Sequence, residues 1–250
     1  PNKSFSILEG RENIGGTWDL FKYPGIRSDS DMHTLGFRFK PWIHDKSIAD
    51  GPSIMEYLHE TINEYKLNDN ILLNHKVDSA NWNSKKSQWE LKINVNNDLK
   101  DMTCNFFFLC GGYYSYTKPH MPYFKNQENF KGQIVHPQFW DESLDYKNKK
   151  IAVIGSGATA ITIVPAIAEQ AEHVVMIQRS PTYVVSGPSE DVINKFLRRI
   201  LSERITYFLI RWKNILYQSF TFFMARKYPE RTKNRILDLA KSEIGVENVD

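Results

Sequence analysis

The distribution of apolar and polar positions predicts short strands alternating with helices. Several short apolar runs, bounded by polar, glycine or proline residues, have the length of strands. These runs are residues 4–8, 71–77, 150–154 and 173–178. Residues 88–95 alternate between apolar and polar, and a turn rich in Asn and Asp separates them from residues 102–109. This pair predicts a β-hairpin.

Helical periodicity connects these strands. Residues 54–65 carry apolar side chains three and four positions apart, and residues 158–170 follow a glycine turn. From about 191 to 241 the pattern is helical again, with a break at Pro229. Strands that alternate with helices indicate an α/β protein with parallel sheets. The run 150–154 has the apolar character of a strand buried on both faces.

Residues 106–112, which read Phe-Phe-Phe-Leu-Cys-Gly-Gly, predict a return into a buried sheet that stops at the glycines. This pattern would be the same with or without a bound ligand. Cys104 and Cys110 lie in this apolar stretch, as buried thiols do in a reducing compartment, and they are too few for a disulfide framework. We therefore expect a cytoplasmic protein.

Composition narrows the classes of partner. The 250 residues carry a formal net charge of only +3, so the overall balance does not favour nucleic acid. The first residues lack the pattern of a signal peptide, and no run of about eighteen apolar residues occurs. A membrane-spanning segment is not predicted, nor is a metal site.

Residues 149–180 carry the strongest motif. They read Lys-Lys-Ile-Ala-Val-Ile-Gly-Ser-Gly-Ala-Thr-Ala, then a helical stretch, then His-Val-Val-Met-Ile-Gln-Arg-Ser. Gly155 allows the tight turn, Gly157 lets the backbone approach a pyrophosphate, and Ala160 lets the helix pack closely on the strand. The anion would lie at the helix N-terminus, where unpaired N–H groups point. The predicted contacts are Gly155, Ser156, Gly157, Ala158, Thr159, Ala160 and Ile161.

Arg179 and Ser180 indicate which dinucleotide this cradle binds. An NAD site usually has an acidic residue at the end of the second strand to bind the ribose 2′-hydroxyl. This chain has Gln178-Arg179-Ser180 there instead. A guanidinium can bind a 2′-phosphate, whereas a carboxylate would repel it. We therefore predict NADP(H); the alternative is a surface arginine at a strand end.

Glu9 indicates a second nucleotide site. It ends the predicted strand 4–8, where a dinucleotide-binding unit places the acidic residue that binds the ribose. The glycine turn that should precede it by about twenty residues has no room in the chain. We expect that the first strand and its GxGxxG loop lie before Pro1. The alternative is that Glu9 is a solvated strand end.

Residues 15–42 are irregular and dense in Gly, Pro and aromatic residues, as functional loops are. With Gly15-Gly16-Thr17-Trp18 and Arg27-Ser28-Asp29, the chain resembles the flavin-containing monooxygenases of the Baeyer-Villiger branch. The resemblance implies that Glu9 binds the FAD ribose and that Val77 lies over the FAD adenine. It also implies FAD contacts from Thr17, Trp18, Asp19 and Leu20, and contacts to both FAD and NADP from Arg27, Ser28 and Asp29. Asp31 is predicted to be a local turn residue.

A second motif carries the same resemblance. Phe130, Gly132, His136, Trp140 and Asp141 fit FxGxxxHxxxW followed by Pro or Asp, the fingerprint of Baeyer-Villiger monooxygenases. An isolated His in a loop is more often a hydrogen-bonded structural residue, although its pKa suits proton handling. Because His136 lies between the two nucleotide units, we predict a hinge or relay role rather than direct proton transfer to substrate.

The resemblance implies an FAD- and NADPH-dependent monooxygenase with two Rossmann-like, three-layer ββα domains, the FAD domain incomplete. NADPH reduces FAD, and O₂ adds to the reduced flavin as a C4a-peroxide. The peroxide inserts one oxygen atom into a ketone or oxygenates the sulfur or nitrogen of a small thioether or amine. Asp29 would help poise the charge where the cofactors meet. The family's catalytic arginine is expected beyond the C-terminus.

The predicted domains are residues 1–115 for FAD, a linker at 116–148, and residues 149–250 for NADP with a helical insertion from about 190. This basic, aromatic insertion could lie on an anionic membrane; we favour a cover over the substrate site because its basic residues are interspersed. One alternative to the enzyme is an NADP(H)-binding module without flavin or activity. A flavin disulfide reductase is disfavoured because the chain has no CxxC or CxxxxC pair.

Overall fold

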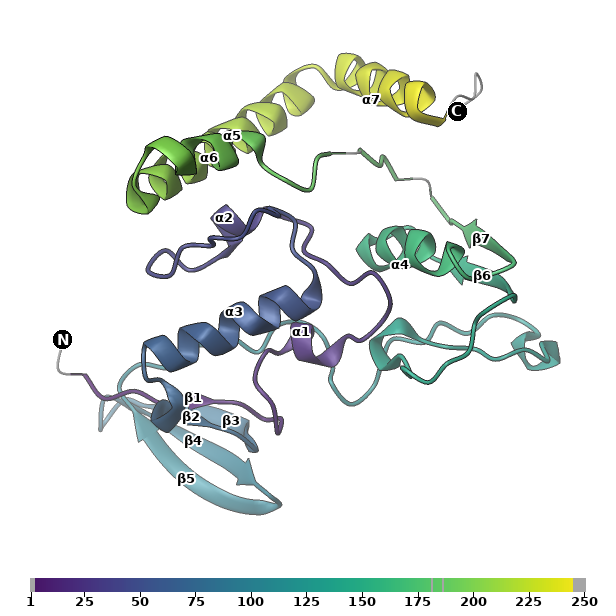
Figure 1. Cartoon of the computed structure of the whole chain (residues 1–250). Helices are drawn as coiled ribbons and strands as arrows, with labels where there is room; N and C mark the ends of the chain where they lie inside the picture. The colour runs from purple at the N-terminus through teal and green to yellow at the C-terminus, as the bar shows by residue number, and fades with distance from the viewer. Residues whose placement is uncertain (1–2, 181, 186, 245–250) are drawn as a thin grey trace. The chain divides into compact units, whose positions relative to one another are not determined.

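The computed structural model describes residues 3–180, 182–185 and 187–244 of a mixed α/β chain (Figure 1). The chain divides into two compact units. Unit 1 comprises Pro1–Tyr23 and Ile54–Glu142, and unit 2 comprises Pro24–Ser53 and Ser143–Asp250. Residues 24–53 thus fold with the C-terminal part of the chain. The predicted domain boundaries at 115 and 148 stay a prediction.

Unit 1 is built around a three-stranded antiparallel sheet in the order β3-β4-β5, formed by β3 (His75–Asn83), β4 (Gln88–Val95) and β5 (Asp98–Cys104). The predicted hairpin is present, and Asn96 and Asn97 make its turn with φ of 52° and 73°. Positive φ at both central residues is the geometry that matches the right-handed twist of paired strands. Leu91, Ile93 and Val95 of β4 form its buried core.

The other elements of unit 1 are short, except for one helix. β1 (Ile7–Leu8) pairs in parallel with β2 (Ile71–Leu72), α1 is Thr17–Leu20, and α3 (Gly51–Glu64) starts in unit 2 and continues into unit 1. Three 3-10 turns complete it: η1 (Asn68–Asn70), η2 (Gln127–Asn129) and η3 (Pro137–Phe139).

Three sequence predictions in unit 1 need correction. The strand expected at 4–8 is only two residues long. The strand expected at 71–77 is divided into β2 and β3 because Asn74 takes a left-handed turn, with φ of 57°. The strand expected at 102–109 starts at Asp98 and ends at Cys104, because Cys104 pairs with Trp89 and β4 itself begins one residue earlier. Beyond the start of β4, no residue of that strand remains to pair with residues 106–109.

The segment that follows β5 is therefore largely solvent-exposed rather than buried, although Phe107 packs against the core of β4. Phe106, Phe108 and Leu109 are 77%, 82% and 84% exposed, and no strand in the described part of the chain pairs with them. Cys110 is exposed and Cys104 half-buried, so the expectation of two buried thiols was also wrong. The apolar pattern of residues 106–110 suits a strand, but a strand also needs a neighbouring strand to pair with.

Among its described residues, unit 2 contains a βαβ motif and four further helices that lie wholly within it. The motif consists of β6 (Lys150–Ile154), α4 (Ala158–Ala168) and β7 (His173–Ile177), with β6 and β7 paired in parallel from Lys150↔His173 to Ile154↔Ile177. All three elements were predicted. The further helices are α2 (Met32–Leu35), α5 (Val192–Ile200), α6 (Glu203–Lys227) and α7 (Pro229–Ile244). The predicted break is at Pro229, the first residue of α7, where proline is well tolerated.

β6 was expected to be buried on both faces, and this was wrong. Ile154, Val175 and Ile177 are 60%, 45% and 48% exposed, whereas Ile151, Val153, Val174 and Met176 on the other face are half-buried. In Figure 1, α4 lies beside this two-stranded sheet, and Ile163 and Ile167 of α4 are buried. One helix covers only one face of the sheet. The complete three-layer domains of the prediction are not resolved among the described residues.

Helices α5 and α6 of unit 2 leave most of their large apolar side chains exposed. α5 buries Asn194, and α6 buries Thr206 and Ile210, while Phe196, Phe208, Trp212 and Leu216 point outward and are 48–62% exposed. Nevertheless, no helix in the described part of the chain combines the length and the apolar character needed to cross a membrane.

Candidate functional site

The turn between β6 and α4 has the backbone geometry of a phosphate cradle. Gly155 has φ of +148°, a conformation that side chains disfavour, and its N–H donates to the carbonyl of Ile177 at 2.9 Å. A Cβ on Gly155 would lie 3.8 Å from the Cβ of Ala160, which is 6% exposed. The backbone conformation therefore explains the glycine at 155, whereas a Cβ there would make only ordinary van der Waals contact with Ala160.

The N-terminus of α4 presents hydrogen-bond donors to open space. Gly157 is its N-cap and supplies no side-chain hydrogen bond, and the first bond within the helix runs from Ile161 N to Gly157 O at 3.1 Å. The N–H groups of Ala158, Thr159 and Ala160 therefore have no partner within the helix. A Cβ on Gly157 would meet nothing within 4 Å. The turn has room and donors for an anion.

The residues at the end of β7 are accessible. Arg179 and Ser180 follow the strand and are solvent-exposed. Because β6 and β7 are parallel, the carboxyl end of β7 lies beside the turn at Gly155. Arg179 therefore follows β7 at the same edge of the sheet as the glycine turn.

The segment of Arg27, Ser28 and Asp29 belongs to unit 2. Gly25, with φ of +80°, packs so closely on α4 that a Cβ there would lie 2.5 Å from the carbonyl oxygen of Thr162. Ser28 is only 2% exposed; its N–H donates to Ala49 O, and its Oγ accepts from Ala49 N. Arg27 and Asp29 on either side are exposed. Ser28 anchors the segment internally, which leaves its neighbours to face outward.

Glu9 is held at the end of β1 by backbone hydrogen bonds. Its N–H donates to Leu72 O at 3.0 Å, and its carbonyl accepts from His75 N at 2.8 Å. The carboxylate accepts from the backbone N–H of Arg11 at 3.0 Å. Val77, the other residue expected beside the adenine, is half-buried on β3 of the same unit.

Arg11 is a residue that the sequence analysis missed. Its guanidinium lies 2.7 Å from the carboxylate of Asp19, donates to the carbonyl of Gly16 at 3.1 Å, and lies over the ring of Tyr116 at 5.5 Å. It thus ties the turn after Glu9 to α1, which carries Thr17 to Leu20. Only the opposite charges of Arg11 and Asp19 signal this contact in the sequence, and charges eight residues apart in a loop predict nothing by themselves.

His136 has a local structural role in unit 1. It is the N-cap of η3, and its Nδ1 accepts from the backbone N–H of Gln138 at 3.2 Å. The buried Gln138 side chain then donates to Ser115 O. Burial, and next the nearby His120, lower the pKa of His136 below its ordinary value. The neutral imidazole that accepts this hydrogen bond is therefore favoured.

The predicted residues are divided between the two units. Unit 1 carries Glu9, Thr17–Leu20, Val77 and His136, and unit 2 carries Arg27–Asp29 with the glycine turn and Arg179. The structure thus brings Arg27–Asp29 onto the unit of the predicted NADP site, although about 125 residues separate them in the sequence. Asp31, predicted as a turn residue, caps α2 by accepting from Thr34 N at 3.0 Å.

Known proteins resemble this chain over most of its length. Residues 42–246 match the flavin-binding monooxygenase-like family. The FAD-containing monooxygenase EthA of Mycobacterium tuberculosis is 50% identical over 245 residues, which is 98% of this chain and 50% of that protein. A probable FAD-binding monooxygenase, AlmA, of an Acinetobacter species is 49% identical over 95% of this chain and 48% of that protein. The chain spans about half the length of these curated relatives.

Solved structures give the same result for the fold. An oxidized steroid monooxygenase bound to NADP superimposes with a TM-score of 0.62 and 28% identity, over 72% of this chain and 35% of that one. A complex of OTEMO with FAD and NADP superimposes with a TM-score of 0.58 and 27% identity, over 71% of this chain and 35% of that one.

Proposed function

The chain belongs to the flavin-binding monooxygenase-like family, and we propose that it binds FAD and NADPH and serves a Baeyer-Villiger type monooxygenase reaction. The substrate would be a small ketone, thioether or amine. In this proposal, unit 1 contributes to an FAD-binding Rossmann-like domain and unit 2 to an NADP-binding one. The FAD-containing monooxygenase EthA, the OTEMO complex with FAD and NADP, and the steroid monooxygenase bound to NADP support this choice of cofactors.

The observation that carries the proposal is the turn between β6 and α4. Its helix N-terminus has unpaired donors, and the space before Gly157 is open where a pyrophosphate would lie. The exposed Arg179 follows at the adjacent strand end, where a guanidinium suits a 2′-phosphate. These features fit NADPH on residues 155–161, Arg179 and Ser180.

The reaction would consume one NADPH, one proton and one O₂ per substrate, and would yield NADP⁺, water and a product with one added oxygen atom. Bound NADPH would supply the hydride, and bound FAD would accept it and activate O₂. The chain's own residues bind and position these groups. Exposed Arg27 and Asp29, anchored by buried Ser28, would set the local charge where the cofactors meet.

The FAD contacts of the proposal lie on unit 1. The carboxylate of Glu9 at the end of β1 would accept from the ribose hydroxyls, α1 would contact the cofactor through Thr17 to Leu20, and the backbone of Val77 would lie over the adenine. Arg11 is a positioning residue here, because it binds both Asp19 and the carbonyl of Gly16. His136 would order its segment of unit 1 through Gln138, which donates to the carbonyl of Ser115.

Flavin absorbance tests this proposal. The purified chain, with FAD supplied during expression, should be yellow; NADPH should bleach it under nitrogen and air should restore it. Glu9→Gln should reduce FAD retention, while the exposed Glu64→Gln, at the end of α3, serves as the control. A colourless chain that still binds NADPH would support the simpler NADP(H)-binding module and reject the monooxygenase reading.

A further inference from the structure

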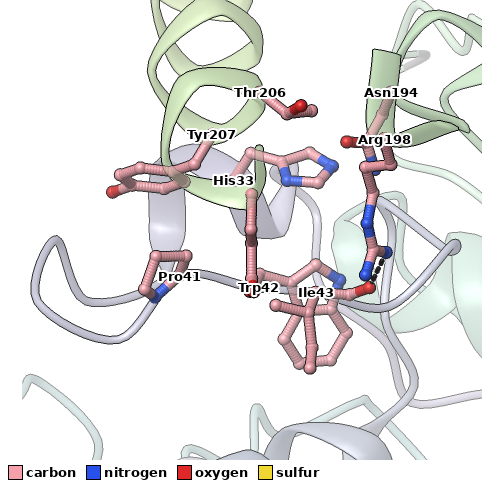
Figure 2. A pocket seen from close by; sticks show the side chains of 9 residues that line it. His33, Pro41, Trp42, Ile43, Asn194, Arg198, Thr206 and Tyr207 are labelled. Carbon is pink, nitrogen blue, oxygen red and sulfur yellow. Dashed lines mark hydrogen bonds between the residues drawn. The ribbon is translucent and has the colours of Figure 1, made fainter. Parts of the chain in front are cut away.

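Three buried polar residues of unit 2 line one small cavity, outside the residues proposed to bind the cofactors. The cavity has a volume of about 10 Å³. Figure 2 shows His33 of α2, Asn194 of α5 and Thr206 of α6 gathered around it, with Arg198 at one side. The three residues come from distant parts of the sequence and are only 2–3% exposed.

Each of these residues has a polar atom without a hydrogen-bond partner. The atoms are His33 Nε2, Asn194 Nδ2 and Thr206 Oγ1, and the described side chains contain no others that are fully buried and unpaired. Leaving a buried polar group unsatisfied costs about 1–3 kcal/mol. Three such groups at one cavity indicate a missing common partner rather than three separate defects.

The size and chemistry of the cavity identify that partner. A cavity needs at least about 10–15 Å³ to hold one water molecule, a size that this cavity just reaches, and buried waters make about three hydrogen bonds. The amide of Asn194 donates, a neutral imidazole nitrogen can accept, and the hydroxyl of Thr206 can do either. We propose that this cavity binds one water molecule, which joins α2 to α5 and α6.

The surrounding charges favour a neutral occupant over a cation. The Arg198 guanidinium lines the cavity and donates to the carbonyl of Ile43, while Arg211 donates to the carbonyl of His33 at 2.7 Å. Lys213 also lies near His33, and the acidic side chains of Asp31, Asp191 and Glu203 offset these positive charges. The unpaired Nδ2 of Asn194 is a donor and cannot ligate a metal ion.

Ion pairs and hydrogen bonds around the cavity already hold the same elements together. Asp31 accepts from Asn214 and Gln218 of α6, each at 2.8 Å, and Lys213 of α6 pairs with Asp191, the N-cap of α5. The water would add a further link among α2, α5 and α6, and we call these contacts together the polar joint. Because α2 begins three residues after Asp29, the joint also fixes the segment that carries Arg27 and Asp29.

Replacing Thr206 by Val distinguishes a hydrated cavity from a dry one by the sign of the effect. If water is bound, Thr206→Val removes one of its partners, and the urea midpoint of unfolding should fall. If the cavity is dry, the same change removes an unsatisfied hydroxyl and should raise the midpoint. Thr221→Val is the matched control, because Thr221 is exposed on the same helix and bonds within it. A midpoint equal to or above that of Thr221→Val overturns the proposal.

A crystal structure of the unmodified chain at neutral pH is the second test, and it does not depend on any variant folding. We expect one ordered water within hydrogen-bond distance of His33 Nε2, Asn194 Nδ2 and Thr206 Oγ1. An empty cavity, or direct bonds among these three side chains, would contradict the proposal.

Discussion

At the residue scale, Gly155 and Gly157 are glycines for different physical reasons. Gly155 needs a backbone conformation that side chains disfavour, whereas Gly157 has an ordinary φ of −82° and open space beside it. We therefore expect Gly155→Ala to cost about 1–3 kcal/mol of stability. Gly157→Ala should change stability by less than about 1 kcal/mol.

For NADPH affinity we expect a large effect from Gly157→Ala, the variant whose stability should be nearly unchanged. A methyl group on Gly157 enters the space proposed for the pyrophosphate, so its NADPH affinity should fall at least tenfold (about 1.4 kcal/mol) without unfolding. Urea unfolding and NADPH titration on the same preparations measure both effects. Normal NADPH affinity in a folded Gly157→Ala would show that the cofactor does not lie on this turn.

Arg179 provides a test of cofactor choice. If its guanidinium binds the 2′-phosphate, Arg179→Ala should weaken NADPH by about tenfold or more, since a hydrogen bond to a charged group contributes about 1.5–3 kcal/mol. NADH, which lacks that phosphate, should bind as before. Equal losses for the two cofactors would assign Arg179 a structural role, and Arg204→Ala, exposed on α6, controls for a general change of charge.

Arg11 connects the residue scale to the elements. Its ion pair with Asp19 is partly buried, with side chains 21% and 14% exposed, whereas the pair of Lys22 with Asp19 is longer, at 3.7 Å, and more exposed. Arg11→Met should therefore loosen α1 and reduce FAD retention, and Lys22→Met should change it little because exposed ion pairs contribute about 0–1 kcal/mol. Retained FAD per protein, read from absorbance, compares them.

At the element scale, α6 buries one of its isoleucines and exposes another. Ile210 is fully buried, but Ile205 of the same helix is 51% exposed. We expect Ile210→Ala to destabilise the chain by about 2–4 kcal/mol through loss of burial and a residual cavity. Ile205→Ala should cost less than about 1 kcal/mol. Comparable losses in the free energy of unfolding for the two variants, measured by chemical denaturation, would mean that α6 buries a different face.

The exposed aromatic face of α5 and α6 has a consequence for handling the chain. Contiguous apolar surface of this kind binds hydrophobic dyes and promotes association. Replacing Phe208 and Trp212 by Ser should reduce the binding of such a dye without lowering stability, because both residues are about half-exposed or more. The double change at Tyr113 and Tyr123, exposed in unit 1, is a control for a general loss of aromatic surface.

At the scale of the whole molecule, acid should weaken unit 2 in a defined order. Burial lowers the pKa of His33 below 6.5, so unfolding takes up a proton there and stability falls as the pH drops below about 6.5. Although burial raises the pKa of Asp191, Lys213 and the N–H of Asn194 hold it below 3.8 overall, so its contribution is lost only below that pH. Lys213 and Arg198 oppose His33 protonation, and Asp31 and Asp191 favour it.

The comparison of wild type with His33→Gln isolates the first of these effects. Between pH 7.5 and 5, the urea midpoint of the wild type should fall more steeply than that of His33→Gln, which cannot take up a proton. His59→Gln, at an exposed position of α3, should retain the wild-type slope. If the urea midpoint changes with pH at the same slope in all three proteins, His33 does not contribute to the loss of stability in acid.

Elements whose sequence signal is local were predicted correctly. The bounds of β4 and β6, the start of α4, the glycine turn and the break at Pro229 follow from periodicity and from the backbone limits of Gly and Pro. These signals need no distant partner. Other features depend on tertiary contacts and could not be predicted from the sequence. They are the end of β5 and the exposed face of β6 and β7, and also the pairing of Arg11 with Asp19. The gathering of His33, Asn194 and Thr206 is a further one. Each of these depends on which neighbour supplies backbone, charge or cover, and apolar periodicity marks a face as suitable for burial without saying what will bury it.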